Sequence, residues 1–211
     1  MPNYVYIDYA KNEYKGEYMQ KLILPLWTVT VLILMIFSLS YPAFATNKIL
    51  VNTNPNNGVK TWSWEGNGLA IELLQVNPDF IRATYASRGL PKTVTEAVAT
   101  RCVFGTIIRN ISDNPLKYKV SDWRYITPDG TENKIKTKTE WVKEWRAMGV
   151  RFSWSILADD PTFEVGDWIQ GFTTMAEPHG SDLDLKVVWK IEGKRYEKIL
   201  PELQCAQAPI D

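Results

Sequence analysis

The sequence predicts a mainly β domain, an antiparallel sandwich with two or three short inserted helices, preceded by an apolar N-terminal segment. Three observations favour this organisation. Apolar and polar residues alternate with a period of two over most of the second half of the chain, which is typical of strands with one buried face. Clusters of Asn, Asp, Gly and Pro separate these stretches as turns. A nearly uninterrupted apolar run stands ahead of them, from Leu22 to Phe37.

Length and charge fit one domain of ordinary size. The chain has 211 residues, and its 24 Lys and Arg residues balance 24 Asp and Glu residues. This balance lacks the basic excess that is typical of nucleic-acid binding or of attachment to an anionic membrane surface. A domain of this length can bury a hydrophobic core without metals or many disulfides.

Residues 22–45 are predicted to target the chain to a membrane. In the apolar run the only polar side chains are those of Thr28 and Thr30, and an α-helix satisfies the backbone of such a segment in lipid. Ala43-Phe44-Ala45 matches the small-residue pattern that a signal peptidase accepts. A buried core helix is the alternative, but the segment shows no amphipathic stripe.

Two fates of this segment stay open. Residues 1–45 form either a cleaved signal peptide or a retained N-terminal membrane anchor, for which the run is long enough. The 20 residues before Lys21 are tyrosine-rich and lack a net positive charge, unlike the start of a signal peptide, whereas a start at Met19 is compact and positive. We expect translation to begin at Met19 and cleavage to follow Ala45. Either fate predicts a periplasmic or otherwise extracytoplasmic domain.

Cys102 and Cys205 are the only cysteines of the chain. In an oxidising compartment a lone pair of cysteines usually closes a disulfide. The competing interpretation, a redox or metal-binding thiol pair, requires close spacing or nearby histidine, and the sequence offers neither. We therefore expect a structural disulfide that ties an early core strand to the C-terminal tail.

The folded domain is expected over residues 69–211. Residues 46–68 are rich in Asn, Gly, Thr and Pro, so they predict an extended arm or linker. A strand is expected from Leu69 to Leu74, because apolar residues alternate along it.

Three stretches carry helix signals. Asn77-Pro78-Asp79 supplies a cap, a first-turn proline and an acidic residue, and Gly89 fits a left-handed stop. Capping boxes predict two more helices, one from Thr93 to Glu96 onward and one from Thr137 to Glu140 onward. Their inner faces are expected from Phe80, Ile81, Thr84 and Tyr85 in the first helix and from Trp141, Trp145 and Met148 in the last.

From Cys102 onward the apolar period changes to two. Residues 102–109 are β-branched and apolar, as in a strand that is buried on both faces. A bulge is expected at Ser121-Asp122 and a turn at Pro128-Asp129-Gly130. Further strands are expected at 116–125, 150–156, 163–175 with a bend at Gly166-Asp167, 183–191 and 196–200.

The order of VFGTIIRNISDNPLKYKVSDWRYITPDG, FEVGDWIQGFTTM and a terminal hairpin resembles the telokin-like, immunoglobulin-type extracytoplasmic domains of bacteria. Those domains have a strand that ends in Asn, a Ser-x-x-Pro-Leu-like turn, an Asp-Gly turn and then a strand centred on Gly. The match covers about half of the mature domain, and the helices around 80–101 and 139–148 depart from the pattern. The resemblance implies an immunoglobulin-like antiparallel β-sandwich.

No catalytic or metal signature stands out. His179 is the sole histidine, and with Met175 nearby it is a candidate for a copper site, because imidazole and thioether suit that metal. One histidine with scattered methionines does not make a ligand set, so a solvated loop histidine is the better interpretation. A Ser-His-Asp triad would need the same histidine. We expect no enzyme activity, no catalytic residue and no cofactor.

Tryptophan is the unusual component, since eight of the nine lie beyond residue 45. Alternation predicts Trp154 and Trp189 in the core. Trp62, Trp64 and Trp168 have no obvious place inside the domain. We consider these three candidates for an interface, because aromatic side chains bury a large area at low entropy cost.

Two classes of function remain open. The first is a non-enzymatic accessory or interaction domain that docks on a partner protein, such as a membrane-bound complex. The alternative is a periplasmic module that binds a small ligand, either a sugar or a metal. Exposed tryptophans in a flat patch would favour a partner, and a cleft with convergent polar groups would favour a ligand. Nucleic acid is not expected as a partner, and membrane contact is expected only through the N-terminal segment.

Overall fold

The computed structural model describes residues 48–153 and 155–208. The chain divides after Phe44 into two units, and the described residues all belong to the second. The export segment, with its expected start at Met19 and cleavage after Ala45, lies outside the described residues and stays a prediction. None of the helices in the described ranges has the length and apolarity that crossing a bilayer requires.

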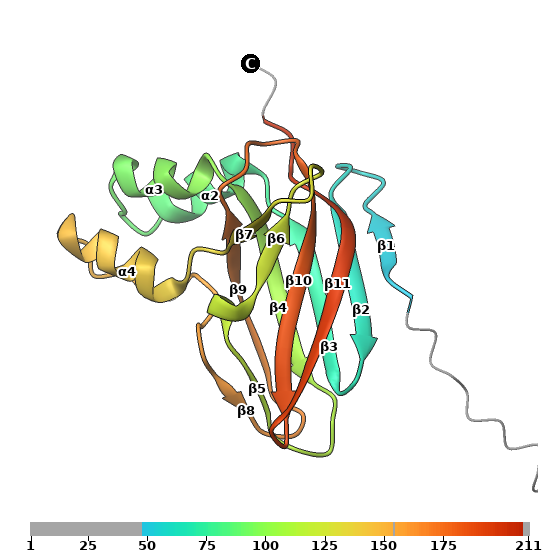
Figure 1. The fold of residues 1–211 in the computed structure, drawn as a ribbon. Coiled ribbons are helices and arrows are strands. Elements are labelled where there is room, and N and C mark those ends of the chain that lie inside the picture. The colour runs from blue at the N-terminus through green and yellow to red at the C-terminus, as the bar shows by residue number, and fades with distance from the viewer. Residues whose placement is uncertain (1–47, 154, 209–211) are drawn as a thin grey trace, which may run out of the picture. The chain divides into compact units, whose positions relative to one another are not determined.

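In the described part of the chain, two antiparallel sheets and three α-helices form a mainly β domain (Figure 1). The helices are α2 (Pro78–Ala86), α3 (Lys92–Ala99) and α4 (Lys138–Ala147), and η1 (Val120–Asp122) is a short 3₁₀ turn. The strands are β1 (Leu50–Thr53), β2 (Lys60–Gly66), β3 (Leu69–Gln75), β4 (Cys102–Asn110), β5 (Leu116–Tyr118), β6 (Arg124–Ile126), β7 (Glu132–Lys134), β8 (Thr162–Phe163), β9 (Trp168–Met175), β10 (Asp182–Ile191) and β11 (Lys194–Gln204).

Strands β1 to β4 belong to the first sheet and β5 to β8 to the second. The chain then returns to the first sheet for β9 and ends in the second sheet with β10 and β11. The first sheet has the order β1-β2-β3-β4-β9. In the second sheet, β10 pairs with β11 along one edge and with both β5 and β6 along the other. The short strands β8 and β7 extend this sheet beside β5 and β6. The crossings therefore follow β4 and β9, the two strands that lie side by side at one edge of the first sheet.

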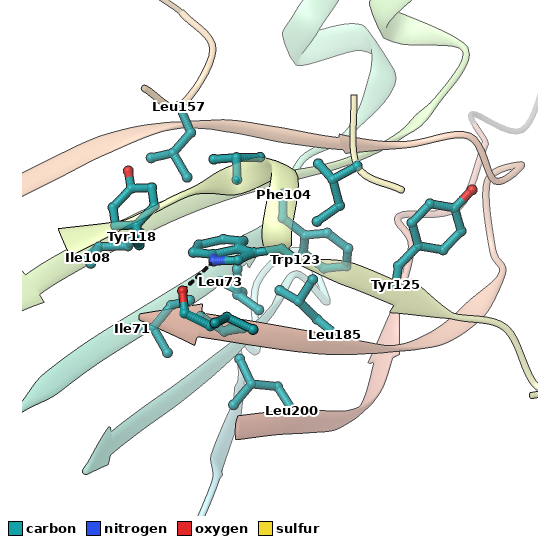
Figure 2. Packing of buried hydrophobic residues seen from close by; sticks show 14 of the residues in the cluster. Ile71, Leu73, Phe104, Ile108, Tyr118, Trp123, Tyr125, Leu157, Leu185 and Leu200 are labelled. Carbon is teal, nitrogen blue, oxygen red and sulfur yellow. Dashed lines mark hydrogen bonds between the residues drawn. The ribbon is translucent and has the colours of Figure 1, made fainter. Parts of the chain in front are cut away.

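Side chains between the two sheets form the main hydrophobic core. Figure 2 shows Trp123, which follows η1, surrounded by side chains of both sheets. Its indole Nε1 donates a hydrogen bond to the carbonyl of Val188 at 3.0 Å, so its one polar group is satisfied in the core. The same cluster includes Ile71, Leu73, Phe104, Leu185 and Leu200.

A second hydrophobic cluster holds the three helices against the outer face of the first sheet. Val103 of β4 contributes to this cluster, whereas its neighbours Cys102 and Phe104 point into the main core. Trp141 Nε1 of α4 donates to Thr174 Oγ1 of β9 at 2.9 Å. The helices gather near one end of the sheets (Figure 1), and the rest of the outer face lies beyond them.

Several local signals give the expected structures. Asn77 caps α2 by accepting a hydrogen bond from the backbone N–H of Asp79. At α4 the capping box between Thr137 and Glu140 is complete. The expected disulfide joins Cys102 and Cys205, whose Cα atoms are 5.2 Å apart.

The predicted arm over residues 46–68 is wrong from Leu50 onward. β1 and β2 form a hairpin there, and β2 pairs with β3 from Thr61 to Gly66. The Asn- and Gly-rich composition belongs to the turns, where Asn54 and Val59 close the hairpin by a backbone hydrogen bond of 2.9 Å. The polar composition of the segment as a whole obscures the alternation of the buried residues Trp62 and Trp64, which is the signal of β2.

The strand expected over 150–156 is also wrong for the described residues of that segment. Phe152 and Ile156 are buried, as the alternation implies. Instead of a strand, the described residues show an isolated parallel bridge between Ile156 and Phe172, in which the backbone of Phe172 hydrogen-bonds Ser155 and Leu157. Trp154 lies outside the described residues, so its expected core position stays a prediction.

Smaller corrections concern helix starts and faces. α3 begins at Lys92 behind Pro91 without a side-chain cap, so the capping box expected at Thr93 does not form. The bulge expected at Ser121-Asp122 is the 3₁₀ turn η1. The segment 163–175 divides between the sheets, because β8 pairs with β5 and β9 pairs with β4. Two residues expected on inner helix faces are exposed, namely Phe80 and Met148.

Candidate functional site on the outer face of the first sheet

The three interface candidates do not lie together on the surface. Trp62 and Trp64 are each only 2 % exposed, so neither is available to a partner. Their rings pack edge-on in the main core against Phe104 and Trp189, with centroids 5.8 and 5.7 Å apart. Trp168 begins β9 and is 60 % exposed. The expectation of an interface role is therefore wrong for Trp62 and Trp64, and Trp168 remains a candidate.

The two candidate metal ligands lie in different surroundings. Met175 is fully buried and packs within the main core. His179 is half-buried in the loop after β9, and its Nδ1 atom is buried without a hydrogen-bond partner among the described residues. Within those residues no group of three His, Cys, Asp or Glu side chains could hold a metal ion. The structure therefore adds no further ligand to this pair.

The part of the outer face that the helices leave uncovered carries three rows of side chains across β3, β4 and β9. Strand register places them, because residues that pair across antiparallel strands point to the same face. The first row is Leu74, Gly105 and Phe172; the second is Glu72, Ile107 and Gln170; the third is Ala70, Arg109 and Trp168.

An apolar groove of about 370 Å³ lies over the first two rows. Gly105 and Ile107 lie under it, Leu74 lies on one side and Phe172 on the other. Phe80 borders it from α2 and is 57 % exposed, although its helix position suggested an inner face. Thr84 follows one turn later on α2, and Arg88 lies just beyond the end of the helix. The groove therefore sits where α2 meets the uncovered sheet.

Gly105 creates the hollow of this groove. It stands in the centre of β4 between Leu74 and Phe172, where a side chain would fill the row. A Cβ atom built on Gly105 would lie 3.7 Å from Val76 Cγ2 and 3.8 Å from Leu74 Cβ, which is ordinary van der Waals contact. Its φ angle is not in the left-handed region. Neither packing nor backbone conformation therefore requires a glycine here.

A second depression, the polar hollow, adjoins the apolar groove over the second and third rows. Trp168 lines it together with Glu65 and Arg109, whose side chains approach to 3.7 Å. Glu72 and Ile107 line both depressions, so the two form one continuous surface. An exposed indole beside charged side chains offers both stacking and hydrogen bonding.

The shifted pKa values of the domain arise in structural contacts. Hydrogen bonds between Arg82 and Glu96 tie α2 to α3, and they raise the pKa of the guanidinium and lower the pKa of the carboxyl. Burial raises the pKa of Tyr85 to about 12, and its hydroxyl shares a hydrogen bond of 2.7 Å with Ser155 Oγ at the border of the apolar groove. Burial likewise raises the pKa of Tyr118 in the main core. None of these four groups is among the residues that line the apolar groove.

Sequence reasoning missed the apolar groove. One signal was available, because a glycine in the middle of a β-branched strand often marks a place where another molecule comes close to the backbone. The row around Gly105, however, depends on the register of three strands that are distant in sequence. No protein-family model matches the chain, and no curated protein is similar enough to be identified as a relative.

Proposed function

We propose that this domain is a non-enzymatic, extracytoplasmic interaction module that docks on a partner protein through the uncovered outer face of the first sheet. The observation that carries the proposal is a band of large apolar side chains along that face. Leu74 is 42 % exposed, and Phe80 and Trp168 are exposed by more than half. Large apolar groups that gather around a groove, rather than scatter singly, are typical of interaction surfaces.

A docking role also fits the chemistry of the groove. Apolar side chains and a bare glycine backbone supply shape and desolvation, which are what an anchor residue of a partner needs. Catalysis by proton transfer would instead require a positioned acid or base close to a reacting atom. The groove is therefore better suited to holding a side chain than to transforming a substrate.

The disulfide supports an extracytoplasmic address, because such bonds persist in oxidising compartments and are rare in the cytosol. It agrees with the apolar segment that stands near the front of the sequence. Either fate of that segment, cleaved or retained, would bring the domain across the membrane.

Strand pairing supports the immunoglobulin-like version of the fold. In that fold a strand B pairs with A and E in one sheet, and C, F and G pair in the other. The pairs β3–β4 and β4–β9 have the A–B and B–E pattern, and β10 between β5–β6 and β11 has the C–F–G pattern. On this assignment, Trp123, which is buried beside β6, would take the place of the tryptophan of strand C. The disulfide differs from the one between strands B and F of immunoglobulin domains, because Cys205 follows β11 and does not lie in β10.

Site-specific photo-crosslinking tests the docking proposal. A photoreactive residue replaces Phe80 in one variant and Trp168 in another, and a third variant carries it in place of the exposed Ile199 of β11 as a matched control. In native membranes we expect the first two to give the same crosslinked species and the Ile199 variant to give none. Equal crosslinking from all three positions, or a native product that migrates as a monomer, would contradict the proposal.

A second candidate function, sugar binding, is favoured by the polar hollow. Trp168 provides an exposed face for stacking, while Ser63, Glu65, Glu72 and Arg109 supply hydrogen-bonding groups around it. Saccharide sites combine an apolar platform with a few placed polar groups. The metal version of this alternative has no matching set of ligands in the described residues.

Fluorescence separates the two candidates. Saturable quenching of the wild-type emission by a panel of oligosaccharides, absent in a Trp168→Phe variant, would favour the sugar module over the docking domain. We expect no saturable quenching, and no difference between the two proteins beyond the lost indole emission.

A further inference from the structure

We propose that the apolar groove receives one bulky apolar side chain from a segment of the partner protein, and that this segment also carries a positively charged group that pairs with Glu72. The inference rests on the proposed docking function and names the chemistry of the docked segment. Its structural basis is a glycine that leaves a hollow beside a carboxylate that has no partner in the part of the chain that the structure describes.

The size of the anchor follows from the row that contains Gly105. Leu74 and Phe172 flank this glycine on the neighbouring strands, so they form two walls with a gap of one side chain between them. Among the described residues no side chain fills the position between these two walls, although a side chain at position 105 would meet only ordinary contacts. A hollow of about 370 Å³ accommodates an aromatic or a large aliphatic group.

The charge of the segment follows from the groups around the groove. Glu72 lies in the next row and borders both depressions, and no ion pair or side-chain hydrogen bond involves it among the described residues. Arg109 already pairs with Glu65, and Arg88 has an interaction of its own within the chain. Among the charged side chains that line the two depressions, Glu72 is therefore the one that has no partner within the described residues, and a cation complements its carboxylate.

The distance between the hollow beside Leu74 and the carboxylate of Glu72 sets the length of a small molecule that can test the inference. Glu72 and Leu74 are two residues apart on one strand, which corresponds to roughly 7 Å along the sheet. The molecule 3-phenylpropylammonium carries a positive charge at a similar distance from its aromatic ring. The matched anion, 3-phenylpropionate, has the same ring and a similar length with the opposite charge.

Saturation-transfer NMR on the full chain in its naturally processed form tests the inference. We expect transfer to the ring protons of 3-phenylpropylammonium, and a signal for 3-phenylpropionate that is weaker by severalfold. In Gly105→Val, which fills the hollow, the signal of the cation should fall at least about fivefold. In Glu72→Gln, the preference for the cation over the anion should disappear. Near-UV circular dichroism checks that each variant is folded.

Each departure from these results overturns the inference. An undiminished signal in Gly105→Val would show that the probe binds elsewhere, and equal signals from the cation and the anion with the wild-type protein would remove the role of Glu72. If Gly105→Val does not fold, Gly105→Ala, whose methyl group fits at 3.7–3.8 Å, gives the same test with a smaller expected decrease. If the probe does not bind as expected but the crosslinks from Phe80 are observed, the docking function stands and only this inference is rejected. If the crosslinks from Phe80 are absent, the docking function itself is rejected.

Discussion

At the scale of single residues, two glycines on adjacent strands have opposite reasons to be glycine. Gly105 of β4 tolerates a Cβ atom at ordinary distances. Gly171 of β9 does not, because its Cβ would lie 2.5 Å from the backbone N and Cα of Leu157, where the chain crosses beside β9. One glycine allows the chain to pack against itself, and the other keeps a hollow open on its surface.

This contrast predicts the effects of two alanine substitutions. Gly171→Ala should lower the free energy of unfolding by about 1–3 kcal/mol, since the crossing segment must move away from β9. Gly105→Ala should leave it unchanged or raise it by roughly 0.5 kcal/mol, because it removes the entropy cost of glycine in a strand. Urea unfolding measures both. A Gly105→Ala variant that is the less stable of the two would contradict this assignment.

The same scale separates the tryptophans. Trp123→Phe should lower the free energy of unfolding by about 2–4 kcal/mol, because it leaves a void and deprives the buried carbonyl of Val188 of its indole donor. Trp168→Phe, at an exposed position, should change it by no more than about 0.5 kcal/mol. Denaturation midpoints of the two variants measure these changes, and a similar loss of stability in both would mean that Trp168 supports the fold.

At the scale of elements, α4 begins with two sets of caps. Thr137 and Glu140 exchange hydrogen bonds in the capping box. Asp159, from the loop before β8, accepts hydrogen bonds from the backbone N–H groups of Lys138 at 2.6 Å and of Thr139 at 2.7 Å. The helix start is therefore both self-capped and tied to a distant loop, which fixes the position of Trp141 and Trp145 on the sheet.

The capping box predicts a pH dependence. Hydrogen bonds from the backbone and hydroxyl of Thr137 lower the pKa of Glu140 below 4.5 in the folded state. The unfolded state therefore binds more protons in this range, so the stabilisation is present above about pH 4.5 and is lost as the pH falls through the lower, folded pKa. Between pH 6 and pH 3 the wild-type protein should lose more stability than Glu140→Gln. Parallel losses, measured by thermal unfolding at each pH, would contradict the role of the cap.

Local signals account for what the sequence predicted well at this scale. Caps, turn dipeptides and alternation act over a few neighbouring residues, so α2, α4, β3, β4 and the terminal hairpin were predictable. The failures involve partners that are distant in sequence. Alternation over 150–156 gave the buried side chains of Phe152 and Ile156 correctly, but whether a strand forms depends on what lies beside it. Exposure of Phe80 likewise depends on how far α2 extends over the sheet.

At the scale of the whole molecule, the site results from incomplete coverage. Three helices bury one part of the outer face of the first sheet and leave the rows of Leu74, Glu72 and Ala70 beyond them. Composition cannot show this division, because covered and uncovered residues alternate along the same strands. The sequence therefore predicted the two-sheet fold and an aromatic surplus, while the groove required the three-dimensional register.

The disulfide connects the two sheets at this scale, since Cys102 begins β4 in the first sheet and Cys205 follows β11 in the second. A loop closed over 103 residues restricts the unfolded chain, which the chain-entropy model values at roughly 4–5 kcal/mol. We expect dithiothreitol, or the paired change Cys102→Ala and Cys205→Ala, to lower the free energy of unfolding by up to that amount. Reduced and oxidised samples with the same urea midpoint would contradict a stabilising bond.

The same bond ties the stability of the domain to its address. If the domain is extracytoplasmic, as we propose, it should be isolated with the disulfide between Cys102 and Cys205 intact, because only the oxidised form has the full stability. Alkylation of the native product before and after reduction measures this directly: we expect label only after reduction. Label before reduction, on protein recovered from the cytosol, would remove the basis of the extracytoplasmic proposal and leave the groove as a surface for a cytosolic partner.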